Sequence, residues 1–167
     1  MKKALLIIAG ILTLLVALGA AAYYSLNQQA VKARQESLAF VKKELPQVVA
    51  NWDPQALLRI TSPQLKPKLS AGELEKVFTF FTQKLGPLKQ YGETRGQSNV
   101  TLSLKGFSSS AVYISQATFA KGPAQLLIGL RKQQGQWHVT DFRVDSPAFR
   151  EMARFEQEKA VITPDNP

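Results

Sequence analysis

The chain has 167 residues, no cysteine and one histidine, and its formal net charge is +9 at pH 7. The lack of cysteine excludes disulfide bonds, thiolate metal sites and a cysteine nucleophile, so a packed apolar core must hold the fold together. The basic excess suits an anionic neighbour or serves solubility. Because the basic residues are scattered and form no long run, they do not indicate nucleic-acid binding.

Residues 1–27 carry the targeting information. Two lysines precede an apolar run, Ala4–Tyr24, in which Thr13 is the one conventionally polar side chain. At about 1.5 Å of rise per residue, a helix over this run is about 30 Å long and can cross a bilayer. The same residues fit a secretory signal that is cleaved near Ala22. The length of the run and its two terminal tyrosines favour an uncleaved anchor, and the cleaved signal is the alternative.

Both interpretations export the rest of the chain. The balance of lysine and arginine on the two sides of the run does not by itself fix the orientation. An apolar segment that begins at residue 4 after Met-Lys-Lys is typical of a bacterial export signal. We therefore expect a bacterial inner-membrane protein with its domain on the periplasmic, extracytoplasmic side. A secreted periplasmic form after cleavage and a cytoplasmic orientation are the alternatives.

Residues 28–50 are predicted to form an amphipathic helix that joins the anchor to the domain. Apolar residues recur every three or four positions on one stripe: Leu38, Val41, Leu45, Val48 and Trp52. Pro46 is expected to interrupt this helix as a kink, because proline lacks the backbone N–H.

Three start signals follow. Asp53-Pro54 and Ser62-Pro63 each place an N-cap before a proline, and the second is expected to begin a very short helix. Ser70 and Glu73 form a predicted capping box for a helix over 71–85, which Gly86-Pro87 ends. The apolar stripe of this helix contains Leu74, Val77, Phe78, Phe81 and Leu85, whereas Phe80 falls off it.

After Pro87 the apolar period becomes alternating, which predicts strands. The segments 88–97 and 100–104 are predicted as strands, the second with Val100, Leu102 and Leu104 on a buried face. Segments 111–119, 124–131 and 137–145 suit antiparallel hairpins, with Ser108-Ser109-Ser110 as a hairpin loop.

The last strand changes phase. Trp137 and Val139 alternate on one face, and Phe142 and Val144 on the other, so a bulge or bend near Thr140-Asp141 is expected. Ser146-Pro147 then predicts the start of a final helix.

Helices followed by a run of strands predict an α+β fold. We expect an N-terminal transmembrane or signal helix followed by helices packed on a bent antiparallel sheet of four to five strands. The predicted divisions are the anchor or signal (1–27), the juxtamembrane helix (28–50), the α+β domain (51–146), and a C-terminal helix with a frayed tail (147–167).

Three segments together resemble the nuclear-transport-factor-2-like superfamily, the cystatin-like or ketosteroid-isomerase-like cone, and within it exported bacterial domains of unknown function. They are Asn51-Trp52-Asp53 through Ser62-Pro63-Gln64-Leu65, then Leu85-Gly86-Pro87-Leu88-Lys89-Gln90-Tyr91-Gly92, and the ending Gly135-Gln136-Trp137-His138-Val139-Thr140-Asp141-Phe142-Arg143-Val144. The resemblance implies a bent sheet wrapped around helices into a cone whose mouth holds a ligand, an active site or nothing. It also implies homodimerisation through the open sheet face.

The enzymes of that superfamily place a carboxylate base, often with Tyr or His, inside the cone. The candidates here are Tyr91, Tyr113, His138 and Asp141, but they match no motif residue by residue, so no catalytic residue is assigned. We expect His138 to face solvent or pack at an edge, and Asp141 to serve the bend. The candidate ligand pocket is Phe81, Tyr91, Tyr113 and Trp137. No motif for a metal or a cofactor occurs, so none is predicted.

The first functional hypothesis is a non-catalytic binding or assembly module of the envelope. It is held at the membrane through residues 4–24 and contacts an anionic envelope component or a partner protein. The alternative is a small-molecule carrier, or an isomerase- or dehydratase-like enzyme, that uses the cone interior. A third hypothesis is a spacer or scaffold. The space between helix 71–85 and the strands is the feature that separates these hypotheses.

Overall fold

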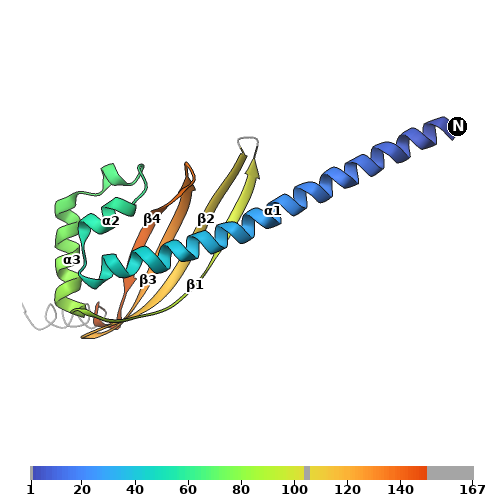
Figure 1. Ribbon diagram of the computed structural model, residues 1–167. Helices are drawn as coiled ribbons and strands as arrows, with labels where there is room; N and C mark the ends of the chain where they lie inside the picture. Colours follow the sequence, from blue (N-terminus) through green and yellow to red (C-terminus); the bar gives the residue numbers. More distant parts are fainter. Residues whose placement is uncertain (1, 104–105, 150–167) are drawn as a thin grey trace, which may run out of the picture.

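A computed structural model describes residues 2–103 and 106–149 and has the predicted α+β class (Figure 1). Three helices and one short 3-10 helix precede the strands: α1 (Lys2–Ala50), α2 (Pro54–Ile60), η1 (Lys66–Lys68) and α3 (Ala71–Leu85). Four strands follow: β1 (Leu88–Ser103), β2 (Gly106–Phe119), β3 (Gly122–Gln133) and β4 (Gln136–Asp145). They form one antiparallel sheet in the order β1-β2-β3-β4, so the described chain has four strands, the lower of the two predicted numbers.

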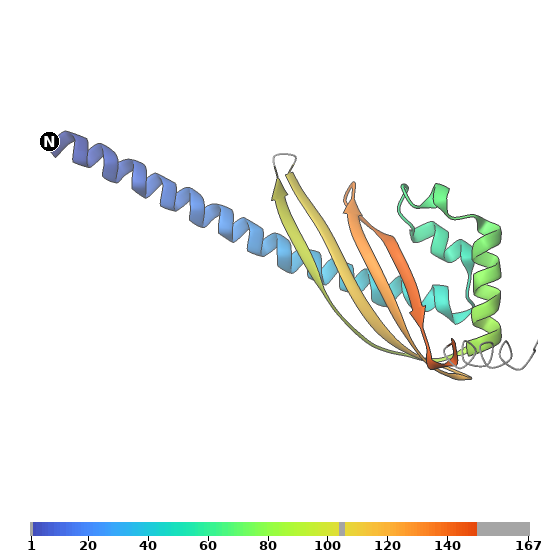
Figure 2. The ribbon, with the colours of Figure 1, turned by 180° about the vertical axis from the view of Figure 1, so that it is seen from behind.

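Helix α1 contains both the predicted anchor and the predicted juxtamembrane helix in one continuous element, and it passes Pro46 without ending. Its first half projects from the rest of the molecule, as Figures 1 and 2 show. The large apolar side chains between Ile11 and Leu18 are 54–66% exposed. Within the described part of the chain, this helix is long and apolar enough to cross a membrane. It is therefore compatible with a membrane anchor or a signal sequence.

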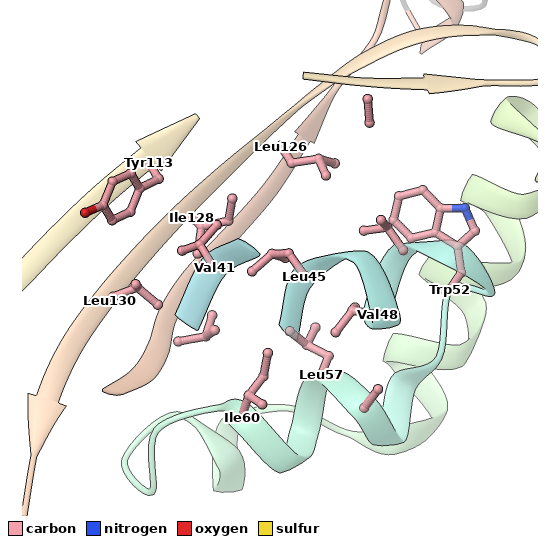
Figure 3. Close-up of a cluster of buried hydrophobic side chains, with 14 of the residues drawn as sticks. Val41, Leu45, Val48, Trp52, Leu57, Ile60, Tyr113, Leu126, Ile128 and Leu130 are labelled. Atoms are coloured by element: carbon pink, nitrogen blue, oxygen red, sulfur yellow. The ribbon is translucent and has the colours of Figure 1, made fainter. Parts of the chain in front are cut away.

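The second half of α1 packs on the sheet. Val41, Leu45 and Val48 are buried, which confirms the predicted stripe. In Figure 3, Val41 and Leu45 face the β3 residues Ile128 and Leu126, whereas Val48 lies beside Leu57 of α2. Because these residues recur at helical spacing, one side of α1 supplies a continuous apolar strip to the core. The same helix therefore forms the anchor candidate and the centre of the domain.

The sheet has one covered face and one open face. Along β2, the buried side chains alternate with exposed ones, as the pleat requires: Ala111, Tyr113, Ser115, Ala117 and Phe119 are buried. Val112 and Ile114 point to the opposite face and are 50% and 41% exposed. The helices thus cover one side of the sheet and leave the other to solvent.

The first hairpin is longer than predicted. The segments predicted as two strands before residue 105 form the single strand β1. Ser108, Ser109 and Ser110 are not a loop, because they pair in β2 with Thr101, Val100 and Asn99. The predicted buried face also fails at Leu102, which is 52% exposed. The hairpin extends beyond the apolar stripe of α1, so no apolar helix side covers this end.

The expected irregularity in β4 is present. Gly129 pairs with Asp141, whereas Leu130 pairs with Val139, so Thr140 is an extra residue in the strand. After this bulge, Phe142 pairs with Ile128 and Val144 with Leu126. Because paired residues share a face, the bulge returns Phe142 and Val144 to the covered side of the sheet.

The helix ends follow most of the predicted signals. The Gln55 N–H donates to Asp53 Oδ1 over 2.8 Å, which confirms the cap of α2, and Gly86 ends α3 with φ +72°. The predicted capping box is wrong, because the Ser70 hydroxyl makes no capping hydrogen bond.

Two further start signals have different outcomes. No helix begins at Ser62-Pro63, since the Ser62 N–H donates to Val139 O over 2.9 Å and the 3-10 helix starts only at Lys66. The Ala148 N–H donates to Ser146 Oγ, as expected for the start of a final helix, but the rest of that predicted helix and its tail lie outside the described residues.

Candidate functional site

An apolar groove separates α3 from the edge strand β4. Its volume is about 280 Å³. We call it the helix–sheet groove and define it by its lining: Leu57, Thr61, Leu65, Leu69, Leu74, Val77, Phe78, Phe81, Val139, Thr140, Asp141, Phe142, Arg143 and Val144. It occupies the space between helix 71–85 and the strands.

Local structure explains why the groove is held open. The Ser62 N–H donates to Val139 O, and Thr61 forms a parallel bridge with Val139, so the end of α2 is fixed to the middle of β4. The bulge at Thr140 then brings Phe142 and Val144 to the same side. Helix α3 forms the facing wall, and its Val77 remains 45% exposed although it belongs to the apolar stripe. Part of the apolar stripe of α3 is thus left uncovered, and it forms one side of the groove.

Asp141 and Arg143 supply the charge of the groove. The Arg143 Nη2 lies 3.1 Å from Asp141 Oδ2, and their side chains are 73% and 40% exposed, respectively. This ion pair is the charged part of a lining that is otherwise mostly apolar. The described lining therefore suits the binding of an apolar group, with one ion pair beside it.

An aromatic cluster packs behind the groove. Trp52 stacks on Phe119, with ring centroids 5.3 Å apart, and contacts Phe78 and Phe81 at 5.5 and 4.8 Å. The Trp52 indole N–H is buried without a partner, the one such side-chain atom among the described residues. Phe80, which falls off the predicted stripe, packs against Phe149 with centroids 5.5 Å apart. Of these rings, Phe78 and Phe81 line the groove, and the others pack behind them.

Of the four residues predicted for a pocket, Phe81 lines the groove and the other three lie elsewhere. Tyr113 is 1% exposed, and its hydroxyl lies 2.8 Å from Ser37 Oγ on α1. It therefore fastens α1 to β2. Trp137 is also buried, and its indole N–H donates to Glu36 Oε2 over 3.3 Å.

Tyr91 lies in a third place, on β1. Its hydroxyl donates to Ser115 Oγ over 2.8 Å, and the Thr94 hydroxyl lies 2.8 Å from the same atom. Burial raises the pKa of the Tyr91 phenol above its ordinary value of 10.0, so the phenol stays protonated at neutral pH. The sequence-predicted pocket set is therefore not gathered around one cavity.

The two remaining candidates also separate. Asp141 lies at the bulge, as expected, and lines the groove, whereas His138 is half-exposed on β4 and does not belong to the described lining. Sequence analysis missed the leucines of the loop before α3, Leu65 and Leu69, which line the groove. Their sequence signal was two leucines spaced four apart between predicted helices, which periodicity alone does not distinguish from surface residues.

No family model matches this chain, and neither a curated protein nor a solved structure matches it.

Proposed function

We propose that this chain is a membrane-tethered, non-catalytic binding or assembly module that holds an apolar group of an envelope partner in the helix–sheet groove. The observation that carries the proposal is the groove itself, which is lined mostly by apolar side chains and includes the exposed Val77. Burying an exposed Val and its neighbours against a partner is favourable at about 25 cal/mol per Å² of apolar surface.

The proposed location is the periplasmic side of a bacterial inner membrane, with residues 4–24 as an uncleaved anchor. Continuity of α1 supports the anchor, because the exposed apolar half and the buried half belong to one helix. Release by cleavage near Ala22 is the alternative. We also propose the nuclear-transport-factor-2-like superfamily and a bent, cone-like sheet. The helices on one face of an antiparallel sheet and the β4 bulge support this.

A photo-crosslinking amino acid at Val77 tests the binding function in intact cells. We expect a discrete adduct with one envelope component, since this side chain opens onto the groove. The same amino acid at Glu75, which is exposed on α3 outside the groove lining, is the matched control. Adding Leu69→Asp in the groove should abolish the Val77 adduct. If both positions give the same adducts, or if Leu69→Asp changes nothing, the groove is not the binding surface.

A small-molecule carrier is the second candidate, because the groove is lined mostly by apolar side chains. A space of about 280 Å³ lies just under the range of ligand pockets, about 300–1,000 Å³, and holds a short acyl chain or one ring. Native mass spectrometry of the detergent-extracted protein distinguishes the two functions. A carrier shows a bound apolar compound that Leu69→Asp removes, whereas a protein-binding module gives the crosslinked partner and no bound compound.

The open sheet face is a second proposed contact. Val112 and Ile114 are half-exposed there, which supports a homodimer through the sheet. Without Lys2 and Lys3, the chain has 19 basic and 12 acidic residues, and this excess of +7 supports attraction to an anionic envelope component. Sedimentation in detergent should show a dimer that Ile114→Lys converts to a monomer; a monomeric native protein contradicts the dimer.

A further inference from the structure

Near the end of the hairpin formed by β1 and β2, two apolar side chains are about half-exposed. Leu102 and Phe107 pair directly across the hairpin and are 52% and 46% exposed. Single exposed apolar residues are common on protein surfaces, but these two are cross-strand neighbours and share a face. They therefore form one apolar patch near the end of the hairpin.

The hairpin runs along α1 toward the N-terminus. Phe119, at the far end of β2, stacks on Trp52. The Tyr113 hydroxyl lies 2.8 Å from Ser37 Oγ. Farther along, Phe107 lines a small hollow together with Gln29. Going back along β2 from Phe119 to Tyr113 and Phe107, the neighbouring residues are Trp52, just after α1, and then successively earlier residues of α1. Figure 1 shows the coloured ends of β1 and β2 nearer the middle of α1 than its C-terminal end.

The continuity of α1 fixes the height of this patch above the proposed membrane span. Gln29, Lys32 and Ala33 line the hollow beside Phe107, and they follow Tyr24 by about 8, 12 and 14 Å along the helix, at about 1.5 Å per residue. The headgroup layer on each side of the hydrocarbon is about 5–8 Å thick, from a total of about 40–45 Å and a core of about 30 Å. Leu102 and Phe107 therefore lie at the outer boundary of the lipid headgroup layer when Ala4–Tyr24 spans the bilayer.

The charges at this level suit anionic lipid. The hollow beside Phe107 is lined by Lys32 and Lys132, and both lysines pair with the single carboxylate of Glu36, so one positive charge is left over. The Lys32 side chain is 67% exposed. Arg34, on the same helix, is also exposed. Basic side chains next to a span are attracted to the negative surface potential of anionic lipids.

We propose that Leu102 and Phe107 insert into the headgroup layer of the bilayer that α1 crosses, as a second membrane contact beside the helix. This inference rests on the uncleaved anchor of the proposed function. A single helix lets a domain rotate and tilt on the membrane, whereas two contacts hold it in one orientation. The hairpin contact would thereby set the direction in which the helix–sheet groove faces.

Spin labels measure the insertion directly, and the cysteine-free chain accepts single labels without further substitutions. Full-length Phe107→Cys carries a nitroxide in vesicles of phosphatidylethanolamine and phosphatidylglycerol. The accessibility of the label to oxygen is compared with its accessibility to a water-soluble nickel chelate. Leu102→Cys is the second test position. Gln116→Cys, exposed on the same strand nearer its other end, is the matched control, and Leu15→Cys marks the anchor.

We expect the oxygen-to-nickel ratio at positions 107 and 102 to exceed that at 116 several-fold, with the highest ratio at 15. If 107 and 102 are as accessible to nickel as 116 while 15 is protected, the hairpin contact is overturned and the tether stands. A slowly moving label at 107 with the ratio of position 116 indicates a protein contact and also overturns the proposal. Exposure of position 15 to nickel overturns the tether, and the hairpin contact with it.

Discussion

At the scale of single residues, Glu36 joins the anchor-bearing helix to the strand pair β3 and β4. Its carboxylate accepts hydrogen bonds from the Lys132 amine and, over 3.3 Å, from the Trp137 indole N–H. The Lys132 hydrogen bond is the main cause that lowers the pKa of Glu36 below its ordinary value of 4.5, against the opposing effect of burial. A lowered pKa means that the charged form stabilises the folded state.

We predict that Glu36→Gln lowers the free energy of unfolding by about 1 kcal/mol at pH 7, because a charged acceptor is replaced by a neutral one. The contribution of the wild-type carboxylate is present in full above about pH 4.5 and is lost as pH falls through the lowered pKa. Denaturant unfolding of both proteins in detergent between pH 7 and pH 3 should therefore show a difference that shrinks on acidification. Glu75→Gln, at an exposed position of α3, is the control and should change stability by less than about 0.5 kcal/mol.

At the scale of elements, β1 depends on Gly96, although glycine in the middle of a strand usually destabilises it. Gly96 pairs with Tyr113 in β2. A Cβ at this position would meet the Val112 carbonyl oxygen and would lie 2.7 Å from the Tyr113 Cα. Backbone atoms cannot move aside as a flexible side chain can, so Gly96 is what permits the two strands to approach here.

Gly96→Ala is expected to lower the free energy of unfolding by about 1–3 kcal/mol, the usual cost of forcing an extra methyl group into a packed site. Gly72→Ala is the matched control, since its Cβ would meet nothing closer than 3.9 Å and the residue lies in helix α3. The control should leave stability unchanged or raise it by up to about 1 kcal/mol. Thermal unfolding followed by circular dichroism compares the two, and equal stability of Gly96→Ala and the parent would contradict the packing argument.

At the scale of the whole molecule, one helix carries both the anchor and the core. The apolar half of α1 projects from the domain, and the other half packs on the sheet (Figure 2). If the domain is extracytoplasmic, as proposed, the groove opens into the periplasm and the hairpin lies at the outer surface of the inner membrane.

Protease added to intact spheroplasts tests this orientation. We expect the domain to be degraded without lysis, while a short fragment that contains Ala4–Tyr24 stays protected in the membrane. Alkaline extraction should leave the full chain in the membrane fraction, because an uncleaved span is held by its apolar residues. Protection of the domain until lysis would place it in the cytoplasm. Release of a shortened chain, which lacks about the first 22 residues, would favour cleavage near Ala22.

Local patterns in the sequence determined the apolar helix, the stripe from Val41 to Val48, the caps at Asp53 and Gly86, and the β4 bulge. These features depend on periodicity and on backbone chemistry within a few residues, which a sequence displays directly. The Ser70 capping box was predicted from a local motif, and such a motif permits a hydrogen bond but does not require it. In the folded chain the Ser70 hydroxyl does not make this bond.

Only the tertiary structure decided which side chains come together. Tyr91, Tyr113 and Trp137 look alike as strand aromatics, yet each has a different partner, and none of the three lines the groove with Phe81. Leu65 and Leu69 line the groove because α2 is fixed to β4 through Ser62 and Val139. The exposure of Leu102 likewise depends on where the apolar stripe of α1 stops. Such contacts join residues far apart in the chain, and their geometry is set by packing, which no local pattern encodes.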